Sequence, residues 1–253
     1  MDILFVILLG GIFGSFANVC IYRLPIEQNV VFGRSFCPEC KKKIAWFDNI
    51  PIISFIILKA KCRNCEFKIS LNYFIVESLS ILFFCVIFIL FGISLTTLLL
   101  WLLYLSFVII FFIDLKHFII PNEITFPLMA LGFVKSFDPN INSIFPNYLN
   151  SLIGGLIGYL IIYLIIFFYK YVRKKEGMGL GDAKLFAVIG FWFGWISIPF
   201  IIFLSSIIAL ISISPNLINK SKNISSEIPF GPYIIIATTI FIVFKDMLLN
   251  LLI

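Results

Sequence analysis

The chain has 253 residues, of which 61% are hydrophobic and only 13% are charged, and its mean hydropathy is +1.11. Soluble globular domains carry about 25% charged residues, so this composition excludes an ordinary soluble protein and indicates one that crosses a membrane several times. Each crossing needs about 20 residues, which leaves room for about eight spans and one modest extramembrane segment. The net charge of +6 does not by itself indicate nucleic-acid binding, since basic loops also orient membrane proteins.

The first apolar segment, residues 3–22, is predicted to be a membrane helix. It has neither a basic start nor a small-residue cleavage site, so we expect it to be retained rather than removed as a signal peptide. Gly10, Gly14 and Ser15 lie on one helical side and favour close packing against another membrane helix. Asn18 is polar, and two roles are open for it: a hydrogen bond to a neighbouring helix or a contact with a substrate.

Residues 23–72 form the only long polar segment of the chain. The segment holds nine of the 19 Lys and Arg residues against four acidic residues. Because basic loops of membrane proteins stay on the cytoplasmic side, we expect this segment to be cytoplasmic and the N-terminus to lie outside.

Two Cys-x-x-Cys pairs lie in this segment, Cys37 with Cys40 and Cys62 with Cys65. Each pair can direct two thiolates to one centre, and four thiolates satisfy a tetrahedral zinc ion. Disulfide bonds are the alternative, but the cytoplasm is reducing, which favours a metal. With all four positions filled by cysteine there is no open site for a catalytic water, so a bound zinc would be structural.

Seven further spans are predicted after the polar segment, and the basic clusters between them put both termini outside. Lys170, Lys175, Lys220 and Lys222 mark loops on the same side as the polar segment. Glu77 lies inside the second span, where it is either a site residue or an acid that snorkels or pairs with a loop cation. The expected spans are residues 73–91, 95–113, 124–134, 152–169, 183–195, 198–213 and 233–252.

Two acids, Asp114 and Asp182, fall at span ends on one face of the membrane by this count. If the fold brings them together they cannot both ionise, so one keeps a proton while the other acts as a base. Such a pair can deprotonate a water for attack on an amide carbonyl, which is aspartic peptidase chemistry. The glycines of the stretch 177–184 would let a substrate backbone approach and would permit unusual backbone angles.

Simpler roles remain open for each acid. Asp182 can cap the helix that follows it, and Asp114 can pair with Lys116 or a loop cation. The whole chain can also be a zinc-ribbon membrane scaffold or a proton- or cation-coupled transporter, in which the acids form a relay. A relay would favour acids near the middle of the bilayer, whereas both of these lie at span ends, which favours the hydrolase. A single histidine and a saturated cysteine set disfavour a zinc hydrolase.

Six motifs in order make the chain resemble the prepilin peptidase family, the GxGD-type membrane aspartic peptidases. The resemblance covers nearly the whole chain. The motifs are residues 14–25 (GSFANVCIYRLP), residues 46–51 (WFDNIP) between the cysteine pairs, residues 61–63 (KCR), Asp114 with residues 120–122 (IPN), residues 179–184 (GLGDAK) and residues 229–232 (PFGP).

The resemblance implies that Asp114 and Asp182 are the catalytic dyad, with Gly179, Gly181 and Lys184 supporting the active site. It implies a type IV prepilin or pseudopilin substrate whose short basic leader is cut after a glycine at the cytoplasmic face. It also implies a second activity, methylation of the new N-terminal amine with S-adenosylmethionine. The residues that would bind this methyl donor are unknown from the sequence.

We therefore predict an all-α polytopic membrane protein with about eight transmembrane helices and a cytoplasmic four-cysteine zinc-binding loop between the first two. Its expected regions are a first helix (1–22), the zinc loop (23–72) and a seven-helix peptidase core (73–253). The expected location is the bacterial cytoplasmic (inner) membrane, in a type IV pilus or type II secretion system. The expected partners are the precursors and the lipid bilayer, with no nucleic acid.

Overall fold

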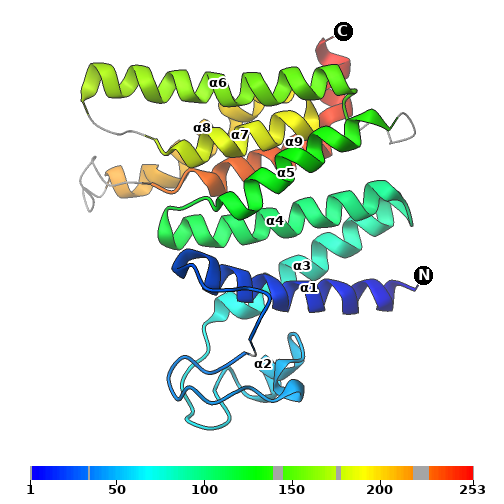
Figure 1. Ribbon diagram of the computed structural model, residues 1–253, viewed down its shortest axis with the longest axis vertical. Coiled ribbons are helices and arrows are strands. Elements are labelled where there is room, and N and C mark those ends of the chain that lie inside the picture. Colours follow the sequence, from blue (N-terminus) through cyan, green and yellow to red (C-terminus); the bar gives the residue numbers. More distant parts are fainter. Residues whose placement is uncertain (1, 34, 139–144, 175–177, 219–227, 253) are drawn as a thin grey trace. The chain divides into compact units, whose positions relative to one another are not determined.

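The computed structural model is all-helical in the part of the chain that it describes, apart from two isolated β-bridges in the polar segment (Figure 1). Gly177, Lys175, Lys220 and Lys222, which contributed to the sequence analysis, lie outside this part. The described residues are 2–33, 35–138, 145–174, 178–218 and 228–252.

A helix lies at each of the segments that the hydropathy predicts to cross the membrane. Five of them are long and apolar enough to do so, namely α1, α3, α4, α6 and α8, which confirms a polytopic helical membrane protein. The shorter α5 and α7, of 13 and 14 residues, do not reach that length. The helices are α1 (Ile3–Arg23), α3 (Leu71–Phe91), α4 (Leu95–His117), α5 (Asn122–Val134), α6 (Tyr148–Arg173), α7 (Leu180–Phe193), α8 (Ser197–Ile218) and α9 (Gly231–Leu252).

The chain forms two compact units, Met1–Phe112 and Ile113–Ile253, and α4 contributes to both. In the first unit α1 packs closely on α3, as its small residues predict. A Cβ on Gly10 would lie 2.8 Å from the Cα of Ile81, and one on Gly14 would lie 2.9 Å from the Cα of Glu77. Glycine therefore lets the two backbones approach, which is how helices associate in lipid.

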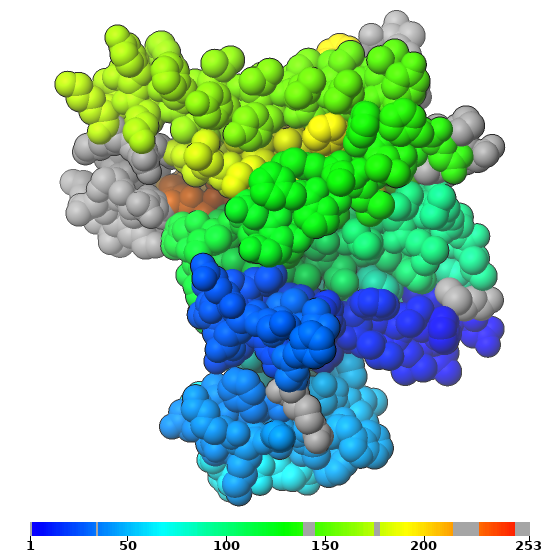
Figure 2. Space-filling model, viewed as in Figure 1, coloured from blue at the N-terminus to red at the C-terminus, as the bar shows by residue number. Residues whose placement is uncertain are grey.

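Most of the polar segment of the first unit gathers in one lobe, coloured light blue in Figure 2. It folds into two short knuckles that repeat the same hydrogen bonds. Cys37 N–H donates to Lys42 O at 3.0 Å, and Cys62 N–H donates to Phe67 O at 2.9 Å. The isolated bridges Phe36↔Lys43 and Lys61↔Lys68 close the two turns. A short helix, α2 (Ile53–Ile57), lies between the knuckles in the sequence.

In the second unit α7 is the central helix and packs against α5, α6, α8 and α9. It is apolar on all sides, and ten of its 14 residues are buried, as expected for a helix enclosed by others. Glycines let α6 come close to it, since a Cβ on Gly154 would lie 2.5 Å from the carbonyl oxygen of Gly190. A Cβ on Gly190 would in turn meet the backbone of Gly154, which cannot move independently of its helix.

We predict that Gly190→Ala destabilises the protein in detergent by about 1–3 kcal/mol, because the added methyl group forces the α6 and α7 backbones apart. Thermal unfolding measures the loss. Leu210→Ala is the control, because Leu210 lies on α8 and is 65% exposed. Equal stability of the Gly190→Ala protein and the wild type would contradict this account of the helix contact.

Candidate functional site

The two acids singled out by the sequence, Asp114 and Asp182, are both buried in the second unit, with 5% and 7% of their surface exposed. Asp114 lies in the last turn of α4, and Asp182 lies in the first turn of α7. Asp114 bonds to the first residue of α9, and the starts of α7 and α9 both pack against Ile120, so the two acids lie in the same region of the second unit. The fold thus brings together two residues that are 68 positions apart in the sequence.

Asp114 is held by the backbone of Gly231, whose N–H donates to Asp114 Oδ2 at 2.9 Å in a buried hydrogen bond. Gly231 is the first residue of α9, where the N–H groups have no partner within the helix and carry a partial positive charge. Among the described residues no ion pair joins Asp114 to Lys116, so the simpler pairing role is not the one observed.

Asp182 occupies the third position of α7, and its carboxyl group lies against the backbone amide of Gly179. A carboxylate in the first turn of a helix interacts favourably with the positive end of the helix dipole, so Asp182 supports the start of α7. Each acid therefore lies at the N-terminus of a helix, α9 for Asp114 and α7 for Asp182. Both helix dipoles favour negative charge at the pair.

The glycines beside Asp182 act through their small size rather than through unusual backbone angles. Gly179 has an ordinary extended conformation, with φ −80° and ψ 148°. A Cβ on Gly181 would lie 3.0 Å from the Cβ of Ile120, and a Cβ on Gly231 would lie 3.4 Å from the Cδ1 of Ile120. Ile120 is therefore an apolar contact shared by the starts of α7 and α9.

Lys184 lies one residue beyond the GLGDA sequence and connects two helices. Its Nζ donates to Asn122 Oδ1 at 2.6 Å, and it lies 5.7 Å from the ring centre of Phe126. Asn122 is the first residue of α5, so this bond ties α7 to the N-terminus of α5. Lys184 thus links α7, which carries Asp182, to the start of α5.

In the first unit, the structure corrects the expectation that Glu77 snorkels or pairs with a loop cation. Glu77 is 9% exposed, and its Oε2 accepts a hydrogen bond from the backbone N–H of Ile52 at 2.7 Å. Asn18 Nδ2 donates to Tyr73 O at 3.2 Å, so Asn18 does bond to a neighbouring helix. A buried acid can use a backbone amide where no cation is near.

The four cysteines lie together, with all four sulfur atoms within 4.8 Å of one another, and all are free thiols. Cys37 Sγ and Cys65 Sγ are 3.8 Å apart. Tetrahedral zinc with Zn–S bonds of about 2.3 Å places its sulfurs about 3.8 Å apart, whereas a disulfide requires about 2.05 Å. Backbone N–H groups of Asn64 and Cys65 lower the pKa of the Cys62 thiol to about 7, whereas the pKa of the Cys65 thiol is raised, so Cys62 loses its proton before Cys65 does.

Asp48 and Arg63, which belong to two separate motifs, form a bidentate ion pair beside the cysteines. Arg63 Nη2 lies 2.6 Å from Asp48 Oδ1, and Arg63 Nε lies 2.8 Å from Asp48 Oδ2. The hydrogen bond from Arg63 holds the pKa of the Asp48 carboxyl below its usual range. This planar pair joins the segment before α2 to the second knuckle.

Two family models cover most of the chain. Residues 8–91 match the bacterial peptidase A24 N-terminal domain, and residues 98–214 match the type IV leader peptidase family. The chain belongs to the type IV leader peptidase family.

Relatives in this family match nearly the whole length of the chain. A prepilin leader peptidase/N-methyltransferase of Vibrio cholerae is 36% identical over 90% of this chain and 91% of its own. Proteins of the same name from Aeromonas hydrophila and Pseudomonas aeruginosa are each 32% identical, over 95% and 97% of this chain and 90% and 91% of theirs. No solved structure matches the chain.

Two contributors to the acid pair, Gly231 and Ile120, were not predicted as site residues, although the motifs that contain them were noted. A backbone amide has no side chain that could signal a role in the sequence. Only the fold shows that the start of α9 lies against Asp114.

We predict that Gly231→Ala sharply reduces peptidase activity, because the new Cβ would lie 2.7 Å from Asp114 Oδ2 and displace that carboxyl group. A hydrogen bond to a charged group contributes about 1.5–3 kcal/mol, so we expect a loss of roughly tenfold or more in the rate of leader cleavage. Thr239→Ala, on the same helix, is the control, since its hydroxyl bonds within α9. Normal cleavage by Gly231→Ala would contradict a role for this contact.

Proposed function

We propose that the protein is a membrane aspartic endopeptidase that removes the short basic leader of type IV prepilins or pseudopilins, and that it then methylates the exposed N-terminal amine. The observation that supports the first activity is the buried pair Asp114 and Asp182, each at a helix N-terminus, in a chain of the leader peptidase family. The names of the relatives, which include N-methyltransferase, support the second.

In the proposed cleavage step one carboxylate of the pair takes a proton from water as the water oxygen attacks the scissile carbonyl. The other carboxyl group is protonated and donates a hydrogen bond to the carbonyl oxygen, on which negative charge develops. The leaving amine then takes up the proton that the first carboxyl group received from water, as the peptide bond breaks. Gly179 and Gly181 leave room for the substrate backbone beside Asp182.

The Gly231 amide fixes the orientation of the Asp114 carboxyl group in this scheme. An acid that is held by one rigid backbone donor keeps its second oxygen available for water. Pre-organisation of this kind is what makes positioned groups effective in catalysis.

The four cysteines are proposed to bind a structural zinc ion that holds the two knuckles of the polar segment together. The donor set fits, because it consists of four thiol sulfurs at tetrahedral spacing, and it leaves no position for a catalytic water. The methyl donor is proposed to be S-adenosylmethionine, which would supply an electrophilic methyl group on its sulfonium.

The proposed topology has eight crossings, with both termini outside and the cysteine segment and acid pair at the cytoplasmic face of the inner membrane. It is supported by the basic residues of the polar segment and of the end of α6, since positive charge stays on the cytoplasmic side. The short helices α5 and α7 would cross as part of the second unit, where α7 is enclosed by other helices.

We predict that Asp114→Asn and Asp182→Asn each abolish leader cleavage, because an amide can neither take the proton from water nor share one with its partner. The measurement is mass spectrometry of a prepilin incubated with the purified protein, with and without S-adenosylmethionine. The mature wild-type product is expected to begin at the residue that follows the glycine of the leader, and to carry the mass of one methyl group only when the donor is present. Full cleavage by either variant would remove the basis of the aspartic mechanism.

We predict one bound zinc ion per chain, and we expect Cys37→Ser or chelation to spare part of the cleavage activity. The acids and Gly231 all lie in the second unit, whereas the cysteines lie in the first. Metal content is measured by mass spectrometry of the purified protein, and Cys85→Ser serves as a control because Cys85 lies on α3, outside the cysteine cluster. A zinc-free wild-type protein with a stable polar segment would contradict the structural role.

A further inference from the structure

Lys135 is a buried cation of the second unit that the proposed cleavage step does not use. It directly follows α5, at the start of the short helix η3 (Lys135–Phe137), and only 5% of its surface is exposed. Among the described residues no ion pair includes it. A charged side chain among apolar helices is costly to bury, so other contacts of Lys135 must stabilise its charge.

These contacts are the end of α7 and two aromatic rings. Lys135 Nζ donates a hydrogen bond to the carbonyl oxygen of Trp192 at 3.2 Å. It also lies 3.9 Å from the ring centre of Phe145 and 5.2 Å from that of Trp192, and aromatic faces attract cations. Trp192 belongs to the last turn of α7, where the carbonyl groups carry partial negative charge. Lys135 therefore complements the negative end of α7.

Two further hydrogen bonds hold the same end of α7. The hydroxyl of Ser151, on α6, donates to the carbonyl oxygen of Phe191 at 2.7 Å. Trp192 Nε1 donates to the carbonyl oxygen of Leu128, on α5, at 2.8 Å. Figure 1 shows α7 beside both of these helices. The last turn of α7 is thus bonded to α5, to α6 and, through Lys135, to η3.

The three hydrogen bonds constrain α7 in a way that its apolar contacts do not. Apolar packing is non-directional, whereas a hydrogen bond has a preferred length and angle. Most of the α7 surface is apolar, and α6 approaches it through glycines, which have no side chain to interlock with a neighbour. The bonded last turn therefore fixes the rotation of α7 and its position along its axis.

The other end of α7 carries Asp182, ten residues before Trp192. Ten residues of α-helix span about 15 Å, so a tilt of about 5° at one end moves the other end by about 1 Å. A displacement of about 1 Å in a catalytic arrangement can lower a rate about a hundredfold. The way in which the last turn is held thus affects the position of Asp182.

We propose that Lys135 is a positioning residue for leader cleavage, which holds the end of α7 so that Asp182, at its start, stays aligned with Asp114. The proposal rests on the acid pair and the cleavage reaction proposed above. Lys135 acts on the pair through α7 alone. The rate of the chemical step therefore depends on Lys135, whereas the affinity for the precursor does not.

A role in stability alone is the competing explanation for Lys135. Packing does not require a cation at this position, because a methionine has a similar length, suits aromatic surroundings and avoids the cost of burying a charge. What methionine lacks is the hydrogen bond to the carbonyl group of Trp192. The two roles differ in the activity of a variant that is fully folded.

The test compares Lys135→Met with the wild type, as full-length proteins in detergent, by the kinetics of prepilin cleavage and by thermal unfolding. At a temperature where both are folded we expect kcat to fall roughly tenfold or more. We expect KM to change by less than about twofold, as for a group that acts only in the transition state. Val134→Ala is the matched control, since Val134 precedes Lys135 and is 64% exposed, and it should keep the wild-type kcat.

Ser151→Ala is a second probe of the same helix end and should also lower kcat, because it removes the bond to Phe191. It decides the question if Lys135→Met does not fold. A wild-type kcat in folded Lys135→Met, or in folded Ser151→Ala where that variant decides, would overturn the proposal. So would a raised KM with unchanged kcat, which would assign Lys135 to precursor binding.

These outcomes are separate from the fate of the proposed function. A wild type that cleaves prepilin, with a normal kcat in Lys135→Met, would contradict the positioning role and leave the peptidase in place. A wild type that cleaves no prepilin, or full cleavage by Asp182→Asn, would contradict the proposed function and this inference with it.

Discussion

The hydrogen bond from the Gly231 amide to Asp114 is the contact around which the second unit is arranged. A carboxyl group among apolar helices is costly to bury unless a donor meets it. The free N–H groups at a helix start provide that donor without a cation, and α7 and α9 both begin at the acid pair. The need for such close approach explains why glycine occupies positions 181 and 231, with Ile120 packed against both. Helix ends, rather than charged side chains, thus hold the pair.

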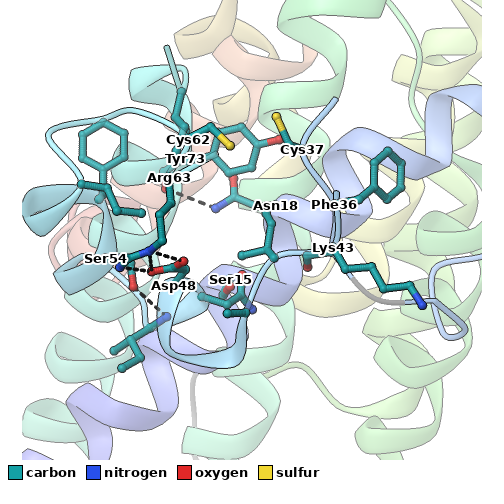
Figure 3. A pocket seen from close by; sticks show the side chains of 18 of the residues that line it. Ser15, Asn18, Phe36, Cys37, Lys43, Asp48, Ser54, Cys62, Arg63 and Tyr73 are labelled. Carbon is teal, nitrogen blue, oxygen red and sulfur yellow. Dashed lines mark hydrogen bonds and ion pairs between the residues drawn. The ribbon is translucent and has the colours of Figure 1, made fainter. Parts of the chain in front are cut away.

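In the first unit, too, a backbone amide stabilises a buried carboxyl group. Glu77 accepts a hydrogen bond from the Ile52 amide, and this bond joins a membrane helix to the polar segment. Ile52 has φ +62°, a left-handed conformation that is unfavourable for a β-branched residue and persists only when its surroundings hold it. The hydrogen bond to Glu77 is one of the contacts that hold Ile52 in this conformation. The strained turn leads directly into α2. It adjoins a cavity of about 430 Å³ in the first unit, which Ile50 and Ser54 help to line (Figure 3).

Much of the architecture was predictable, because hydropathy and cysteine spacing depend on local sequence alone. A helix occurs at every apolar run that was marked, and the Cys37–Cys40 and Cys62–Cys65 pairs converge as their spacing indicates. The partners of buried acids were not predictable in this way. A loop cation was one of the partners left open for Glu77, but the observed partner is a backbone amide. Gly231 likewise acts through its N–H, a group that every non-proline residue has. The cavity of the first unit could not be predicted either, because its wall combines α1, α3 and two loops that are distant in sequence.

The acid pair lies in the second compact unit and the cysteine cluster lies in the first. This division accords with the order in which the proposed reactions must occur. Before cleavage, the nitrogen that is to be methylated belongs to a peptide bond, where its lone pair is delocalised into the carbonyl group and is a poor nucleophile. Cleavage releases that lone pair, so methylation can only follow it. Cleavage therefore has no chemical need for the cysteine segment, whereas methylation needs the product of cleavage. Loss of zinc from the cysteine cluster would for this reason leave the chemistry at Asp114 and Asp182 intact.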